Sequence, residues 1–169
     1  MATAAVRAHP NANLSLSPEA RRRMRDQREG VVRGYYNDGS GNRGHCSYGI
    51  GILAHRGPCT AAELRRPLSS AQMEASFAMA IRDAEAAVRR HVINQTLTQA
   101  QFDALVSYSF NTGARGASET FQQVNRGDLR GAADTIRSNV YSRQNGRLVR
   151  MPGLVPRRRE ESAPFLEGE

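Results

Sequence analysis

The sequence contains no lysine and no tryptophan, and only two of its 169 residues are cysteines. Aromatic residues make up 6% of the chain. No apolar run approaches the roughly 18 residues that a membrane-spanning helix needs, which excludes such a helix and stable membrane insertion. The first residues lack a basic segment followed by an apolar one, so we expect no secretory signal peptide.

All 24 basic residues are arginines. The chain has 16 acidic residues, so its formal net charge is +8. One interpretation is codon bias in a GC-rich genome. The other is function, because arginine binds carboxylates and phosphates through two parallel hydrogen bonds whereas lysine acts as a point charge. Either way, a sequence pI near 10.6 predicts attraction to a polyanion: nucleic acid, an anionic membrane or a bacterial wall.

The hydrophobic content of 39% is sufficient for a core, and the length suits one domain or two small lobes that share a connecting element. The pattern predicts an α+β fold with a small β-hairpin lobe followed by a larger helical lobe. Helix-capping residues precede most of the predicted helices: Ser17, Thr60, Ser69, Thr98 and Asp128. The predicted helices cover residues 18–29, 60–66, 69–91, 98–113, 117–126, 128–138 and 154–166.

The organisation along the chain follows from these elements. Residues 1–16 are small, polar and aperiodic, and are predicted to be a flexible tail. Within the single domain over residues 17–169, we expect the hairpin lobe at about 30–66, the connecting helix at about 69–91 and the helical lobe at about 92–166. Residues 139–152 are polar and rich in turn formers. The connecting helix carries one apolar stripe: Met73, Phe77, Ile81, Ala84 and Val88.

Two acidic residues stand out on the hairpin lobe. Glu29 lies where the first helix should end, and Asp38 lies within the glycine-rich hairpin. Glycoside hydrolysis needs a protonated carboxyl and an ionised one on opposite sides of the bond. With 16 acidic residues the pair alone is weak evidence, since a helix-terminal glutamate and a turn-forming aspartate are also ordinary structural features.

Four blocks of sequence strengthen the hypothesis. They are residues 28–38 with the Gly49-Ile50-Gly51 strand, residues 97–113 ending in Phe110-Asn111-Thr112-Gly113, residues 125–134, and residues 152–161. In this order they resemble the E-G…aromatic…D…T-x-G-x-G start, the central helix with its F-N-x-G end, the N-x-G-D-x-x-G-A-A-D segment and the G-L-x-x-R-R-x-x-E helix of the phage lysozymes of glycoside hydrolase family 24. The resemblance spans about residues 18–166 and implies a two-lobed, lysozyme-like fold.

The resemblance also implies roles for residues. Glu29 matches the general acid, and Asp38 matches the carboxylate that orients the attacking water. Ser47 occupies the position where the family has threonine, after a longer spacing from Asp38 than is usual. Arg158 matches an arginine that reaches back to the catalytic glutamate; alternatively, residues 157–159 form a solvated face. The candidate substrate-binding residues are Tyr36, Gly49, Gly51, Asn111, Gly113 and Arg158.

The two cysteines allow more than one interpretation. Cys46 and Cys59 form a disulfide in an oxidising compartment, which would clamp the loop to the hairpin, and stay reduced in the cytosol. Together with His45 and His55 they also offer four soft ligands, although the spacing is not that of a common zinc site. A cysteine nucleophile paired with His55 is the weakest alternative. We expect no metal and no cofactor.

The function implied by the resemblance is an N-acetylmuramidase (lysozyme) of the inverting type, with peptidoglycan as its partner. We expect a monomer that is made in the cytoplasm, acts on the wall in the periplasm, and is delivered by a holin or a secretion apparatus. A phage endolysin and an effector injected into rival bacteria both fit. The other classes considered are an inactive wall-binding module and a nucleic-acid-binding module; scattered arginines without a reader motif argue against nucleic acid.

Overall fold

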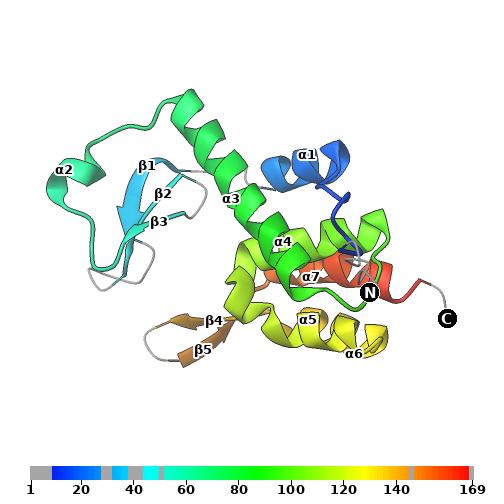
Figure 1. Cartoon of the computed structure of the whole chain (residues 1–169). Helices are drawn as coiled ribbons and strands as arrows, with labels where there is room; N and C mark the ends of the chain where they lie inside the picture. Colours follow the sequence, from blue (N-terminus) through cyan, green and yellow to red (C-terminus); the bar gives the residue numbers. More distant parts are fainter. Residues whose placement is uncertain (1–8, 28–31, 38–43, 50–51, 145–146, 168–169) are drawn as a thin grey trace, which may run out of the picture.

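A computed structural model of the chain describes residues 9–27, 32–37, 44–49, 52–144 and 147–167. Two unequal lobes are joined by the long helix α3 (Ser70–His91), as Figure 1 shows. The α+β, lysozyme-like architecture expected from the sequence is confirmed. The smaller lobe holds an antiparallel sheet of strand order β1-β2-β3, built from β1 (Val32–Asn37), β2 (Cys46–Gly49) and β3 (Ile52–His55), and the short helix α2 (Ala61–Leu64).

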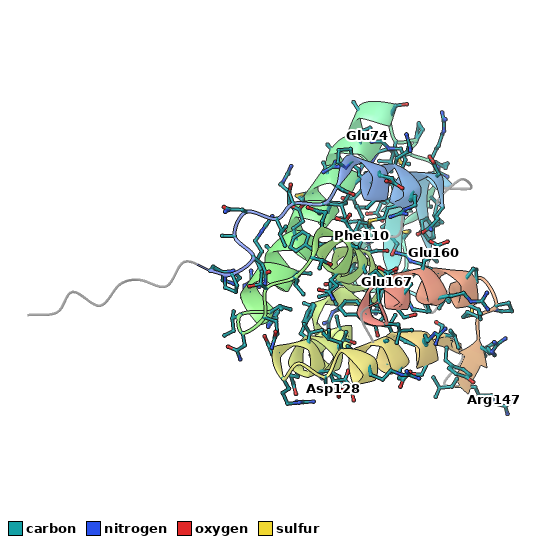
Figure 2. The ribbon with its side chains drawn as sticks, turned by 90° about the vertical axis from the view of Figure 1, so that its right-hand side faces the viewer. Glu74, Phe110, Asp128, Arg147, Glu160 and Glu167 are labelled. Carbon is teal, nitrogen blue, oxygen red and sulfur yellow. A yellow bond between two sulfur atoms is a disulfide. The ribbon has the colours of Figure 1, made fainter. Side chains whose placement is uncertain are left out.

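The larger lobe is mainly helical. Its elements are α1 (Pro18–Asp26), α4 (Gln99–Gly116), α5 (Ser118–Asn125), α6 (Leu129–Ser138), β4 (Tyr141–Gln144), β5 (Arg147–Arg150), α7 (Leu154–Ser162) and the 3-10 turn η1 (Ala163–Phe165). In the side view of Figure 2, α1 lies above α7, and α5 and α6 form the lower layer. None of the described helices is both long enough and apolar enough to span a bilayer.

The predicted helix starts are correct because their signals are local. Thr60, Ser69 and Thr98 each form a capping box, in which the side chain accepts from the third helical amide and the third side chain accepts from the cap's own amide. Ser17 accepts from the amide of Ala20 at the start of α1, and Asp128 accepts from the amide of Gly131 at the start of α6. Each cap satisfies amides that no helical carbonyl can reach.

The core lies between α3 and α4 and extends to α5, α6 and η1. Four of the five stripe residues on α3 are buried; Met73, near the β lobe, is partly exposed. Other residues in the same cluster are Phe102, Leu105, Val106, Phe121, Val124, Ile136 and Phe165. Burying one such side chain contributes about 1.5–3 kcal/mol, so the α3 stripe is a principal reason why the connecting helix is straight and well packed.

The prediction of a flexible tail over residues 1–16 is wrong for residues 9–16. Asn11 is fully buried, and its amide nitrogen donates to the carbonyls of Val92 and Gln95, both at 2.9 Å. Its Oδ1 accepts from the amide of Leu97 at 2.9 Å. Leu16 belongs to the core. The asparagine serves backbone groups in the loop between α3 and α4, a long-range role that composition does not reveal. Residues 1–8 lie outside the described part of the chain.

Two strand predictions also need correction. The β lobe has a third strand, β3, beyond the predicted hairpin, and residues 141–150 form the β4–β5 hairpin instead of an irregular turn-rich segment. The Asn145-Gly146 dipeptide between β4 and β5 is a strong hairpin signal that the sequence contained. The described strand residues around it are exposed, so hydrophobic patterning carried little information there.

Candidate active site

Helix α1, which precedes Glu29 in the sequence, is held at both ends. At its start, the backbone amide and hydroxyl of Ser17 donate to Asp103 on α4, at 3.0 and 2.6 Å. At its end, Gln27 Nε2 donates to Glu160 on α7 at 3.1 Å, and Arg25 pairs with Glu74 on α3 at 2.8 Å. Figure 2 shows Glu74 and Glu160 on either side of α1. Three other helices therefore determine where the chain leaves α1.

We expect Asp103→Ala to lower the free energy of unfolding by about 1–3 kcal/mol, because it leaves the amide and the hydroxyl of Ser17, at the start of α1, without their buried acceptor. Urea unfolding followed by circular dichroism measures this change. Asp134→Ala is the matched control: Asp134 is exposed and lies 3.6 Å from Arg130 in an i,i+4 pair. Its effect should stay below about 0.5 kcal/mol. Equal effects from the two variants would contradict the role given to Asp103.

The two predicted catalytic carboxylates flank described elements but lie outside them. Glu29 falls in residues 28–31, between α1 and β1, and Asp38 directly follows Asn37, the last residue of β1. Gly51 also lies outside the described residues. The separation of the two carboxyl groups and the pairing of Glu29 with Arg158 remain predictions. The structure does describe α1 and β1, the elements that precede Glu29 and Asp38, and the sheet that contains β1.

Ser47 lies in β2, the central strand of the three-stranded sheet. Its Cα is paired with Tyr36 on β1 and with Leu53 on β3, and the residue is almost fully buried. A side chain on a central strand is held by neighbours on both sides, which suits a group that must keep one orientation. Tyr36 is half-buried next to Ser47.

A disulfide lies beside the end of β1, the strand that directly precedes Asp38. Cys46 and Cys59 are bonded, with their Cα atoms 4.6 Å apart. Asn37 is the strand partner of Cys46, and its Oδ1 accepts from the amide of Cys59 at 2.7 Å. The amide of Cys46 also donates to the carbonyl of Gly57 at 2.7 Å. The ends of β1 and β2 are therefore tied to the loop before α2.

The zinc set considered from the sequence is not assembled in this form of the protein. The disulfide uses both sulfur atoms, and His45 Nδ1 accepts from the amide of Gly57 at 3.0 Å. The disulfide also leaves no thiol to act as a nucleophile beside His55.

His55 instead contacts Glu63 of α2. His55 Nε2 lies 3.1 Å from Glu63 Oε1, and His55 Nδ1 lies 3.1 Å from the carbonyl of Arg56. That carbonyl, followed by Glu63, raises the pKa of His55 above its ordinary value. The amide and then the hydroxyl of Thr60, followed by His55, lower the pKa of Glu63 to about 2.

Gly49 has a structural role, and its contact with substrate stays a prediction. Its φ of 57° is in the left-handed region, and a Cβ there would lie 3.1 Å from Met73 Sδ. The residue is buried between β2 and the start of α3. Glycine is required here because the sheet approaches α3 closely while the backbone turns.

The end of α4 displays two of the predicted substrate-binding residues. Gly113 interrupts the helix with φ 74° and ψ 161°, and a Cβ built on it meets nothing within 4 Å. This positive φ explains why residue 113 is a glycine. The prediction that the helix over residues 98–113 ends there describes the break correctly. Asn111, two residues earlier, is exposed, and no described residue accepts from its Nδ2. That amide is available to a ligand.

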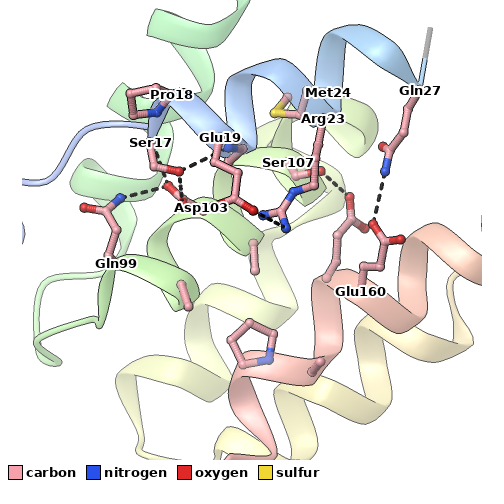
Figure 3. Close-up of a pocket in the computed structure, with 16 residues that line it drawn as sticks. Ser17, Pro18, Glu19, Arg23, Met24, Gln27, Gln99, Asp103, Ser107 and Glu160 are labelled. Carbon is pink, nitrogen blue, oxygen red and sulfur yellow. Dashed lines mark hydrogen bonds and ion pairs between the residues drawn. The ribbon is translucent and has the colours of Figure 1, made fainter. Parts of the chain in front are cut away.

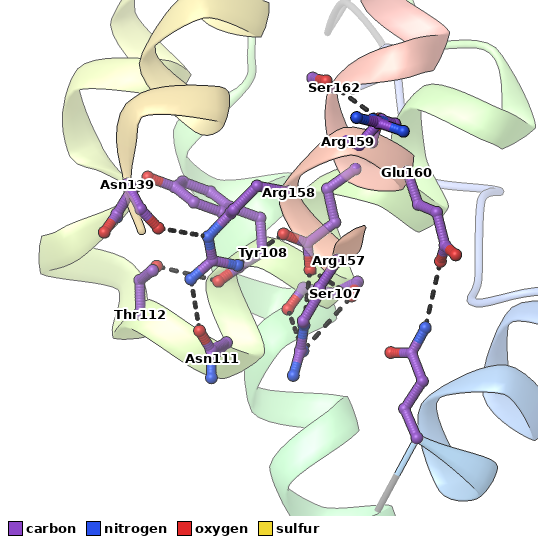
Figure 4. A network of polar contacts seen from close by, with 12 residues as sticks. Ser107, Tyr108, Asn111, Thr112, Asn139, Arg157, Arg158, Arg159, Glu160 and Ser162 are labelled. Atoms are coloured by element: carbon purple, nitrogen blue, oxygen red, sulfur yellow. Dashed lines mark hydrogen bonds and ion pairs between the residues drawn. The ribbon is translucent and has the colours of Figure 1, made fainter. Parts of the chain in front are cut away.

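The side chain of Arg158 is buried, and Figure 4 shows its polar contacts with the protein; its contact with substrate stays a prediction. Each of its three nitrogen atoms donates to the protein. Nε donates to the carbonyl of Asn139 at 2.7 Å, Nη1 to Glu161 at 2.6 Å, and Nη2 to Asn111 Oδ1 at 2.5 Å. The guanidinium also stacks over the ring of Tyr108. The alternative of a solvated face over residues 157–159 is wrong for Arg157 and Arg158, whereas Arg159 is exposed. Arg158 orients Asn111.

Glu161 completes this network, and the sequence analysis did not single it out. It is buried, accepts from Arg157 Nε at 2.9 Å and from the hydroxyl of Ser107 at 2.6 Å, and pairs with Arg158. Two arginines thus share one buried carboxylate between α7 and α4. The R-R-x-x-E pattern placed these residues on one helix face, and that spacing was the available signal.

A pocket of about 810 Å³ lies elsewhere, between α1, the first half of α4 and the α7–η1 segment (Figure 3). Its lining includes Ser17, Gln27, Asp103 and Glu160, which are engaged in the contacts that hold α1. None of the predicted site residues within the described part of the chain lines it. We therefore assign the candidate active site to the β lobe and the end of α4.

Comparison with known proteins decides the family. A family model described as phage lysozyme matches residues 26–161, a range that contains every predicted site residue. The chain belongs to the phage lysozyme family.

Two endolysins are similar to part of this phage lysozyme. That of Bacillus phage B103 is 39% identical over 75 residues, which cover 43% of this chain and 27% of the endolysin. That of Acyrthosiphon pisum secondary endosymbiont phage 1 is 37% identical over 75 residues, which cover 43% of this chain and 51% of the endolysin. The matched part thus spans about a quarter and a half of these relatives.

Solved structures share the fold over almost the whole chain. The muramidase domain of SpmX from Asticaccaulis excentricus matches with a TM-score of 0.68 and 25% identity, covering 90% of this chain and 98% of that one. The endolysin from Escherichia coli O157:H7 phage FAHEc1 matches with a TM-score of 0.71 and 24% identity, covering 93% and 96%. The chain therefore shares its two-lobed fold with a bacterial muramidase domain and a phage endolysin.

Proposed function

We propose that this phage lysozyme is a peptidoglycan hydrolase, specifically an N-acetylmuramidase that cleaves the β-1,4 bond between N-acetylmuramic acid and N-acetylglucosamine. The supporting observation is the family match over residues 26–161, which contains the two carboxylates and the hydroxyl in the order of the family pattern. The similarity to a muramidase domain over 90% of the chain agrees with it.

In the proposed mechanism, Glu29 gives a proton to the oxygen that links the two sugars. Asp38 is ionised and, with the hydroxyl of Ser47, aligns a water molecule on the opposite face of the sugar; as the water attacks the anomeric carbon and the bond to the linking oxygen breaks, its proton passes to Asp38. An inverting reaction of this kind needs the two carboxyl groups about 6.5–9.5 Å apart so that the water fits between them. The disulfide and the amide of Cys59 hold Asn37, and they would thereby restrict the position of the neighbouring Asp38.

Substrate recognition is proposed to involve both lobes. Asn111 would donate its free Nδ2–H to a carbonyl of an N-acetyl group, since Arg158 holds its Oδ1. The net charge of +8 would concentrate the enzyme on the anionic wall, and salt would weaken this attraction. We propose a monomer that is made in the cytoplasm and acts on the wall during host lysis, with a holin for delivery.

Digestion of purified sacculi followed by mass spectrometry tests the bond and the reaction. Fragments that end in a reducing muramic acid support hydrolysis at the proposed bond. A reducing glucosamine end would assign another bond, and an anhydromuramic end would assign transglycosylation. Intact sacculi after prolonged incubation with folded protein would refute the hydrolase itself.

Ser47→Ala should reduce the rate of sacculus hydrolysis by about ten- to a hundredfold, since the water loses one of its two orienting groups. Ser47→Thr, which keeps the hydroxyl, is the matched control and should retain most of the activity. Turbidity of a sacculus suspension measures both variants, and thermal unfolding verifies their folding. Unchanged activity in a folded Ser47→Ala variant would assign the water-orienting role to another group.

A further inference from the structure

Four side chains with metal-binding atoms meet at the end of the β lobe away from α4. One ligand atom each of Cys46, His55 and Glu63 lie within 4.8 Å of one another, and Cys59 is bonded to Cys46. They come from β2, β3, α2 and the loop before α2. In a tetrahedral zinc site with bonds of about 2.0–2.3 Å, neighbouring ligand atoms lie about 3.3–3.8 Å apart. The His55–Glu63 distance of 3.1 Å is already close to that range.

The histidine and the glutamate are oriented as metal ligands usually are. His55 Nε2 faces Glu63, and in the neutral imidazole whose Nδ1–H donates to the carbonyl of Arg56, the lone pair of Nε2 is free to bind an ion. Histidine ligands typically donate their second ring N–H to a carbonyl or carboxylate in this way. Glu63 Oε2 accepts from the amide and the hydroxyl of Thr60, at 2.7 and 2.8 Å, so the carboxylate is also held before any ion binds.

We propose that, when the disulfide is reduced, Cys46, Cys59, His55 and Glu63 bind one Zn²⁺ ion. Reduction adds two electrons and two protons and yields two thiols; binding of the ion releases both protons, because the ligands are thiolates. Transfer of two electrons to an oxidising disulfide, by thiol–disulfide exchange, restores the Cys46–Cys59 bond and expels the ion. The start of β2 and the loop before α2 are thereby cross-linked in either state.

Cobalt is a suitable probe for this site because its spectrum reports thiolate ligands and coordination geometry. The protein is reduced with an excess of a phosphine, which becomes a phosphine oxide, and is titrated with Co²⁺ without oxygen. We expect one Co²⁺ per chain, a thiolate-to-cobalt charge-transfer band and the visible bands of tetrahedral Co²⁺, all removed by one equivalent of Zn²⁺. The oxidised protein should show none of these bands. A reduced protein without them overturns the proposal.

Two variants identify the non-sulfur ligands. His55→Ala and Glu63→Gln should each weaken Zn²⁺ binding by at least about tenfold. Glutamine can still complete the capping box of α2, so Glu63→Gln keeps the local fold. His45→Ala is the matched control, since His45 adjoins Cys46 but is not one of the four proposed ligands. The affinity of this variant for Zn²⁺ should be unchanged. Affinities that are unaltered in both ligand variants, with folding verified by circular dichroism of the oxidised forms, overturn the four-ligand site.

Discussion

Glu29→Gln should reduce hydrolysis of exposed peptidoglycan by about 10²–10⁴-fold. Glutamine matches glutamate in size and still forms hydrogen bonds, but its amide cannot give a proton to a departing sugar oxygen. The loss should therefore appear in kcat, with little change in KM, since substrate binding does not require the transferable proton. Muropeptide release from purified sacculi, measured at several substrate concentrations, separates the two parameters.

The control for this variant is on helix α1, which precedes Glu29 in the sequence. Glu19→Gln changes an exposed carboxylate of α1 that pairs with Arg23 at 3.5 Å, and it should leave activity unaltered. Both variants should unfold at nearly the same temperature as the parent protein. A Glu29→Gln enzyme with near-normal kcat would remove Glu29 from the proposed mechanism, whatever the result for Asp38.

Glu161→Ala should lower the free energy of unfolding by about 3–5 kcal/mol, the largest stability effect we expect. The substitution leaves Arg158 buried without a countercharge and removes the acceptor of Arg157. Removing one partner of a buried pair is costly because the remaining charge stays out of water. Denaturant unfolding of the parent and the variant measures the difference directly.

Glu160→Ala provides the matched comparison for this prediction. Glu160 is exposed on the same helix and accepts one hydrogen bond from Gln27 at 3.1 Å. Its removal should cost about 0.5 kcal/mol. Similar losses from Glu160→Ala and Glu161→Ala would mean that the buried network between α7 and α4 contributes no more than a surface contact.

Helix boundaries were predictable because their signals lie within a few residues of each other. The capping boxes at Thr60, Ser69 and Thr98 and the break at Gly113 depend on local backbone geometry alone. The β4–β5 hairpin was missed because its exposed strands lack an apolar face. Asn11 was missed because its three partners are more than 80 residues away in the sequence.

The sequence predicted the residue types of the candidate site, but not their burial or which of them lie together in space. The family pattern identified Glu29, Asp38 and Ser47 as residue types in a specific order, and the positions of Cys46 and Cys59 indicated a potential disulfide. It could not reveal that Arg158 is buried, because solvation depends on which helices pack over α7. It also gave no reason to connect Glu63 with the cysteines, since the capping of α2 and the pairing of β2 with β3 bring them together only in space.

The sequence by itself determined the α+β order of elements, most helix ends and the family to which the chain belongs. These follow from local hydrogen bonding at caps, from apolar periodicity and from motif order, all of which act over short distances along the chain. Only the tertiary structure decided that Arg158 and Glu161 form a buried pair, that Gly49 is required by contact with Met73, and that four ligand atoms gather beside β2. Burial and long-range contact depend on how separate elements pack, and a linear pattern does not contain that information.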